Sequence, residues 1–243
     1  MDTLTIAAAS GLRARMESLD MLANNLANAE TGGYKTDREF YNLYVSVDAA
    51  GGSDAGAATL PVIERPWTDF SQGALHATGS PLDLALSGKG FFAVDGPSGS
   101  LFTRNGSFRV SPAGALVTSE GYPVRTVSGA HLQIAPDGAL EVSADGSVRQ
   151  NGQALGQLEI ADFADSGTLV KQGTSYFRSS AASRPAAGVG VEQGKLESSN
   201  VGPAESAVRL VSVMRQFEML QKAATLGSQM SREAVQEVAR VAS

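Results

Sequence analysis

The two ends of the chain carry the same pattern of hydrophobic positions. Between Asp2 and Asn28, hydrophobic side chains recur at alternating spacings of four and three residues, at Leu12, Met16, Leu19, Ala23 and Leu26. This heptad spacing is typical of a helix that packs along another helix. The glycine pair Gly32-Gly33 predicts the end of this first helix, because glycine terminates helices readily.

The same pattern continues for longer at the C-terminal end. Spacings of three and four residues alternate without a break through Leu210, Val213, Phe217, Leu220, Ala224, Gly227, Ser231, Ala234, Val238 and Val241. Pro203 suits a first helical turn, and Glu205 just inside it favours the positive end of the helix dipole. We therefore predict a helix from Pro203 onwards, roughly 60 Å long at about 1.5 Å per residue.

Weak helix formers lie on or beside both patterns. The small ones are Gly11, Gly227 and Ser231, and the amides are Asn24, Asn25 and Asn28. A glycine inside a helix costs about 1 kcal/mol relative to alanine. We interpret the small residues as points of close approach to another helix, the alternative being tolerance of a weak position. The asparagines favour specific hydrogen bonds across a helix interface, the alternative being a solvated helix end.

Two terminal helices cannot account for their own stability. Most helix stability comes from packing, and ordering the backbone costs on the order of 1–2 kcal/mol per residue. Two helices alone bury only one stripe each. We infer that copies of the same element surround them, so that the ends of the chain serve polymerisation.

The middle of the chain changes to a strand pattern. Leu82, Leu84 and Leu86 alternate with other residues, and turn dipeptides then recur at short intervals: Asp95-Gly96, Asn105-Gly106, Ala113-Gly114, Glu120-Gly121, Asp137-Gly138, Asp145-Gly146 and Asn151-Gly152. Such spacing predicts short antiparallel strands joined by hairpins. The fold class is therefore α+β, with terminal heptad helices that pair as a coiled-coil base for an inserted β-rich domain.

This pattern divides the chain into four segments. We expect an N-terminal assembly helix over 1–33, an extended linker over 34–80, a β-rich outer domain over 81–201 and a C-terminal assembly helix over 202–243. Within the linker, residues 48–59 are small and polar and predict a mobile loop.

Composition excludes several classes of protein. The formal charge of −6 comes without a clustered basic patch, which argues against nucleic-acid binding. The absence of cysteine excludes disulfide scaffolds, thiolate metal sites and cysteine nucleophiles. The N-terminal residues do not read as a signal peptide, and no apolar run predicts membrane insertion.

Candidate chemistry is sparse. The two histidines, His76 and His131, have no partner at metal-ligand spacing. Gly88-Lys89 lacks the remaining positions of a phosphate loop, so we expect a turn before Phe91 instead. The acids Asp137, Asp145 and Asp162 do not form a calcium loop. We expect neither an enzyme nor a cofactor or metal site.

Four segments carry a family resemblance. Residues 23–35 (ANNLANAETGGYK), 82–94 (LDLALSGKGFFAV), 102–108 (FTRNGSF) and 194–201 (GKLESSNV) resemble, in the same order, segments of the bacterial flagellar rod and hook proteins. The resemblance covers both ends and much of the middle. Within the family, the chain looks most like the proximal-rod protein, with the distal-rod protein as the near alternative.

The resemblance implies a location and a set of partners. Such a subunit would leave the cytoplasm through the flagellar type III export apparatus, without a cleaved signal peptide. It would polymerise helically, with copies of itself and other axial proteins, into the basal-body rod that transmits torque around the export channel. We expect its assembly interface to include Leu12, Met16, Leu19, Asn24, Asn25, Leu26, Asn28, Leu210, Val213, Phe217, Leu220, Gly227 and Val238.

Two readings from other classes compete with this one. A secreted β-domain binding module with a coiled-coil stalk would also combine helices and strands, although a stalk normally lies on one side of its head domain. A hydrolase on a β scaffold is disfavoured, because only two histidines are present.

Overall fold

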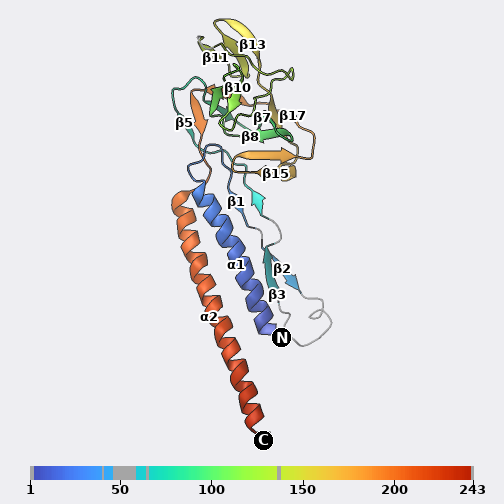
Figure 1. Cartoon of the computed structure of the whole chain (residues 1–243), viewed down its shortest axis with the longest axis vertical. Helices are drawn as coiled ribbons and strands as arrows, with labels where there is room; N and C mark the ends of the chain where they lie inside the picture. Colours follow the sequence, from blue (N-terminus) through green and yellow to red (C-terminus); the bar gives the residue numbers. More distant parts are fainter. Residues whose placement is uncertain (1–2, 40, 46–58, 64–65, 136–137, 242–243) are drawn as a thin grey trace. The chain divides into compact units, whose positions relative to one another are not determined.

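In a computed structural model, the chain begins and ends with a long helix, and a series of short strands lies between them in the sequence (Figure 1). The structure describes residues 3–39, 41–45, 59–63, 66–135 and 138–241. The first helix, α1, covers Thr3–Ala27, and the second, α2, covers Pro203–Val241. Both helices begin and end close to the positions that the heptad pattern and the Pro203 and Gly32-Gly33 signals predict.

Short strands fill the sequence between the helices. In chain order they are β1 (Asp37–Arg38), β2 (Tyr41–Val45), β3 (Thr59–Ile63), β4 (Trp67–Thr68), β5 (Leu75–Ala77), β6 (Leu84–Ser87), β7 (Phe91–Gly96), β8 (Gly99–Thr103), β9 (Phe108–Val110), β10 (Leu116–Thr118), β11 (Leu140–Val142), β12 (Ser147–Gln150), β13 (Gln153–Gln157), β14 (Ile160–Asp162), β15 (Leu169–Gln172), β16 (Tyr176–Ser179), β17 (Arg184–Pro185), β18 (Gly190–Gln193) and β19 (Lys195–Glu197), with a 3₁₀ turn, η1, at Ser166–Thr168. The α+β class is confirmed.

The chain folds into two compact units that are each discontinuous in sequence. The first, here called the helical unit, combines Met1–Ala27, Asp37–Trp67 and Gly202–Ser243. The second, here called the strand unit, combines Asn28–Thr36 and Thr68–Val201. Most of the loop predicted over 48–59 lies outside the described residues, because only Thr59, the first residue of β3, belongs to them.

A six-stranded antiparallel sheet in the order β15-β16-β8-β7-β14-β17 forms the centre of the strand unit. Smaller antiparallel ladders surround it: β11-β12-β13, β10-β9, β18-β6 and β19-β5. In the helical unit, β2 pairs with β3. The short strands and their antiparallel pairing follow from the closely spaced turn signals.

The central strand β7 is buried on both faces. Phe92 and Val94 belong to one hydrophobic cluster, whereas Phe91 and Ala93 belong to the other. Successive side chains of a strand point to opposite faces, so a strand covered on both sides reads as a continuous hydrophobic run. This explains why 91–94 lack the alternation seen at 82–86.

Turn signals of the sequence lie where the strands reverse direction. Asn151 and Gly152 have φ angles of 51° and 77° between β12 and β13, as a two-residue hairpin turn requires. Gly88, with φ 110°, lies in the predicted turn before Phe91. The turn predicted at Asp137-Gly138 falls partly outside the described residues.

One carboxylate of the strand unit depends on a buried tyrosine. The Tyr176 hydroxyl donates to Oε2 of Glu120, and the Tyr176 side chain is 7 % exposed. Burial would raise the pKa of Glu120, but the hydrogen bonds from Tyr176 and its neighbours outweigh burial, and the net effect lowers that pKa. Burial and the Glu120 carboxylate raise the pKa of Tyr176.

Replacing Tyr176 with phenylalanine should therefore cost about 1 kcal/mol of unfolding free energy near neutral pH. A lowered carboxyl pKa stabilises the folded state above its unfolded value of 4.5, and this stability is lost as pH falls through the folded pKa. The difference between the two proteins should thus shrink below pH 4.5. Urea unfolding at a series of pH values measures it, and a difference that grew in acid would contradict the assignment.

Candidate assembly interface

Helix α1 turns a face of small and polar residues inward. Among the α1 residues whose burial the structure describes, the buried ones are Gly11, Ala14, Ser18, Leu22 and Asn25. Helix α2 packs along α1, and a Cβ added to Gly11 would lie 3.5 Å from Cδ1 of Leu220. The small side chains allow the two helix axes to approach closely, as the interpretation of Gly11 predicts.

The heptad residues of α2 occupy its buried side. Val213 is buried, while Leu210, Phe217 and Leu220 are half-buried. Gly227 is exposed, and an added Cβ there would meet nothing within 4 Å. Val238 lies within the last turns of α2.

The heptad residues of α1 lie on a different side from its buried face. Leu12, Leu19 and Leu26 are half-buried, and Met16 is 54 % exposed. At 100° per residue, this row is roughly a third of a turn from the row that includes Gly11. The chain thus uses the small face against α2, and Met16 and Ala23 of the hydrophobic row remain exposed.

The asparagines at the end of α1 fasten the chain to itself. Nδ2 of Asn25 donates to the carbonyl of Asp37 at 2.8 Å, and the amide of Asp37 donates back to Oδ1 of Asn25 at 3.0 Å. Oδ1 of Asn28 accepts from the Thr31 hydroxyl at 3.1 Å. Asn24 is exposed. Asn25 and Asn28 therefore make hydrogen bonds within the chain.

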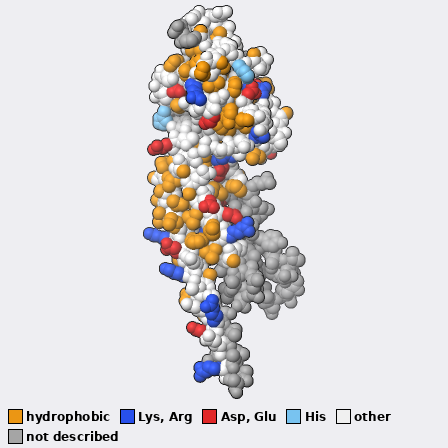
Figure 2. All heavy atoms as spheres, viewed as in Figure 1, with side chains coloured by type: hydrophobic (Ala, Val, Ile, Leu, Met, Phe, Trp, Pro, Cys, Tyr) orange, Lys and Arg blue, Asp and Glu red, His pale blue; other side chains and the backbone are white. Residues whose placement is uncertain are grey.

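A second hydrophobic row runs along the other side of α2. It consists of Val208, Val211, Met219, Leu226 and Met230, which are 72, 49, 62, 59 and 70 % exposed. A shallow groove of about 630 Å³ follows the N-terminal part of this row, from Val208 to Met219. Figure 2 shows hydrophobic side chains gathered along the helices, with charged residues between them. The sequence signal for this row is the recurrence of Val208, Val211, Met219, Leu226 and Met230 at spacings of three, eight, seven and four residues, which sequence reasoning missed.

The four family-like segments meet in the core of the strand unit. Lys35, Arg104 and Glu197, from three different segments, have side chains that are 0, 3 and 0 % exposed. Nζ of Lys35 lies 2.5 Å from Oε1 of Glu197, and Nη1 of Arg104 lies 3.1 Å from Oε2. The fourth segment contributes the Gly88 carbonyl, which accepts from Nη2 of Arg104 at 2.6 Å. We call Lys35, Arg104 and Glu197 the ionic core.

Neighbouring groups add hydrogen bonds to Lys35 and Glu197 of the ionic core, whereas Nε of Arg104 is buried without a hydrogen-bond partner among the described residues. Lys35 also donates to the carbonyl of Ser71 at 2.7 Å, and Oε1 of Glu197 accepts from the amide of Gly73 at 2.9 Å. Burial lowers the pKa of Lys35 and of Arg104, while the Glu197 carboxylate opposes this effect in both. Two buried cations thus share one carboxylate, which makes this carboxylate essential for the core.

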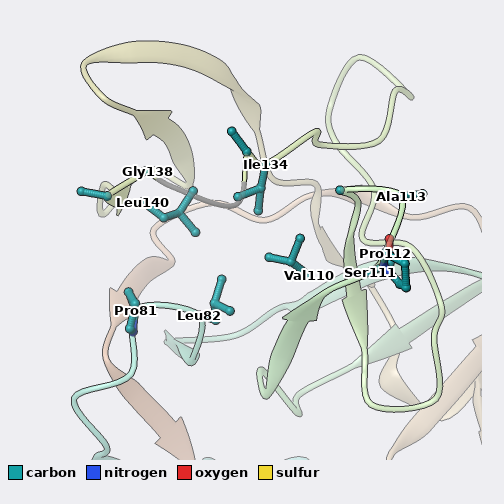
Figure 3. A pocket seen from close by; sticks show the side chains of 12 residues that line it. Pro81, Leu82, Val110, Ser111, Pro112, Ala113, Ile134, Gly138 and Leu140 are labelled. Carbon is teal, nitrogen blue, oxygen red and sulfur yellow. The ribbon is translucent and has the colours of Figure 1, made fainter.

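The strand unit contains an apolar groove of about 850 Å³. Leu82, Val110, Ile134 and Leu140 surround its centre, and Pro112 lies at its edge (Figure 3). None of the described residues that line it is charged.

Other chemical signals are equally weak in the described part of the chain. Nε2 of His131 lies 2.8 Å from the carboxylate of Asp95 in an exposed pair. Among the described residues, no cluster of histidine and acidic side chains could hold a metal ion. No helix within the described ranges is long and apolar enough to cross a membrane.

Comparison with known proteins identifies three matching family descriptions along the chain. Residues 7–35 match "Flagella basal body rod protein", residues 85–155 match "Flagellar hook protein FlgE/F/G D1 domain", and residues 192–237 match "Flagellar basal body rod FlgEFG protein C-terminal". These ranges include the segments 23–35, 102–108 and 194–201 and most of the segment 82–94, on which the sequence resemblance rests.

Curated relatives span nearly the whole chain. The flagellar basal-body rod protein FlgF of Mesorhizobium japonicum is 34 % identical over 82 % of this chain and 83 % of its own length. FlgF of Caulobacter vibrioides is 33 % identical over 92 % of each chain. FlgG of Bacillus subtilis is 32 % identical over 93 % of this chain and 95 % of its own. The chain belongs to the flagellar basal-body rod protein family.

Proposed function

We propose that this rod protein, a structural protein and not an enzyme, polymerises helically through its terminal helices. In this proposal α1 and α2 pair as a coiled-coil base, so that segments 1–33 and 202–243 form an inner tube around the export channel. Segment 81–201 forms the outer layer, and 34–80 links the two. The exposed hydrophobic row of α2 is the observation that carries the proposal.

The energetics of that row favour a partner. Full burial of a valine, leucine or methionine side chain stabilises by about 1.5–3 kcal/mol relative to exposure. Val208, Met219, Leu226 and Met230 each leave more than half of the side chain in water. Single exposed hydrophobic residues are ordinary, but several of them along one side of a long helix are typical of an interaction site.

The partners are copies of this chain and other axial proteins of the rod, and the subunits reach the rod through the type III export apparatus. We place the protein in the proximal rod, with the distal rod as the alternative. Relatives named FlgF and FlgG match at 34 to 31 % identity, so identity alone does not decide between positions. These relatives are all named as flagellar basal-body rod proteins, and none of them is named as a secreted binding module.

A tag inserted between Asn151 and Gly152, in an exposed hairpin turn, would locate the protein along purified basal bodies. Electron microscopy of the labelled rod should find the tag near the inner-membrane end. Label confined to the hook end would favour the distal position, and label away from the rod would contradict the proposal.

Truncating the internal helix contact should weaken assembly. Leu220→Ala and Phe217→Ala each remove a half-buried side chain from the side of α2 that packs on α1. Large-to-small changes at buried sites cost about 2–5 kcal/mol, and these half-buried sites should fall at or below the lower end. Sedimentation of the full chain over a concentration series measures self-association. The exposed neighbour Gln221→Ala is the control, and unchanged assembly in both variants would refute the helix-pair assignment.

A further inference from the structure

The two hydrophobic sides of α2 lie opposite each other. Leu220, which contacts Gly11 of α1, and Leu226, which is 59 % exposed, are six residues apart, and their directions differ by about a third of a turn around the helix. Averaged over each row, the separation is close to half a turn. Helix α2 can therefore contact one helix on each side, and the chain supplies only one of them.

We propose that the exposed row of α2 packs, antiparallel, on the Met16 side of α1 from a neighbouring copy. This inference rests on the proposed function and names the partner surface for it. The accepting side of α1 combines the exposed Met16, Asp20 and Ala23 with the half-buried Leu12 and Leu19. Hydrophobic side chains alternate with charged ones on both surfaces, so neither is a purely apolar patch.

The pairing within the chain gives the register. α1 and α2 run in opposite directions and Gly11 lies beside Leu220 (Figure 1). Moving along α1 from Gly11 to Ala23 therefore corresponds to moving back along α2 from Leu220 to Val208. In the same register between copies, Leu12 of one copy meets Met219 of the next, and Ala23 meets Val208.

Charge complementarity supports this register. With Gly11 level with Leu220, Asp20 falls near Arg209, and Arg15 falls near Glu218. At 100° per residue, Asp20 and Arg209 lie on the same flank of the two facing rows, while Arg15 and Glu218 lie together on the other flank. Both flanks thus bring opposite charges together, which favours the pairing and its direction.

The contact joins two different surfaces, and this identifies a second copy as the partner. Every copy carries both the α2 row and the α1 side, so each copy can give one surface and receive the other. Such head-to-tail contacts extend without limit, unlike a two-fold contact that closes after two copies. A row of alternating α1 and α2 helices from successive copies would result.

Cysteine cross-linking tests the inference cleanly, because the chain contains no cysteine. Full-length Ala23→Cys and Val208→Cys proteins are mixed, concentrated and oxidised. The two positions face away from each other's helix within one chain, so a mixed disulfide must join two copies. We expect the mixed dimer of Ala23→Cys and Val208→Cys to dominate. Gln221 lies on another side of α2, so Gln221→Cys mixed with Ala23→Cys should give at least tenfold less mixed dimer.

The charge pair gives an independent measurement. Arg209→Asp should weaken self-association in sedimentation by about tenfold, and adding Asp20→Arg should restore it, as a reversed ion pair would. Val208→Cys homodimers in place of the mixed species, or failure of the double variant to recover, would overturn this contact while leaving polymerisation intact. If the unsubstituted chain stays monomeric at every concentration, the proposed function fails as well.

Discussion

Glu197→Gln should lower the unfolding free energy of the strand unit by about 3–5 kcal/mol, the range for breaking a buried ion pair by removing one partner. The substitution keeps the shape of the side chain but removes the carboxylate that Lys35 and Arg104 share. The new amide nitrogen would also face Nη1 of Arg104, placing a donor against a donor at a distance of 3.1 Å. Chemical denaturation followed by circular dichroism measures the change.

Glu192→Gln is the matched control for this experiment. Glu192 lies in the neighbouring strand β18 and pairs with Lys195 at 2.5 Å, but these side chains are 34 and 42 % exposed. Exposed pairs contribute only about 0–1 kcal/mol, so this variant should be nearly as stable as the parent. Equal losses of unfolding free energy in both variants would show that a buried ion pair contributes no more to stability here than an exposed one.

Gly33→Ala should destabilise the strand unit by about 3 kcal/mol or more, because it combines backbone strain with overpacking. Gly33 has a φ angle of +67°, and an added Cβ would lie 2.3 Å from the amide nitrogen of Asn105 and 2.4 Å from the carbonyl carbon of Arg104. The amide of Gly33 also donates to the carbonyl of Glu197 at 2.7 Å. Relief of the clash would therefore displace two of the segments that hold the ionic core.

The adjacent glycine supplies the control. A Cβ at Gly32 would come no closer than 3.3 Å to Oδ1 of Asn105, a side-chain atom, and its φ angle is not positive. Gly32→Ala should cost less than about 1 kcal/mol on these grounds. Thermal unfolding of both variants separates them, and comparable melting temperatures would argue that the site relaxes without cost.

The sequence predicted the α+β class and the positions of both helices, because these depend on local signals. Pro203 marks the first residue of α2, and heptad spacing runs through both helices. The hydrogen-bond partners of Lys35 could not be predicted in the same way. Its Glu197 partner is 162 residues distant, and a lysine beside a tyrosine gives no sign of burial.

Part of the inward face of α1 escaped prediction for a different physical reason. Hydrophobic spacing identified Leu12, Met16 and Leu19, yet α1 also buries Ala14 and Ser18 within the chain. Close approach of two helices requires small side chains, and small side chains contribute little to a hydrophobic pattern. Whether the row with Met16 forms the predicted assembly interface stays a prediction that cross-linking can test.

The ionic core also sets an order of events for folding. Lys35 comes early in the chain, and its counter-charge comes 162 residues later. A chain that emerges from its N-terminus must keep Lys35 in water until Glu197 has followed, because an unpaired charge is too costly to bury. Closing so long a loop is slow compared with forming local turns. We therefore expect the ionic core to form only after the chain as far as Glu197 has become available.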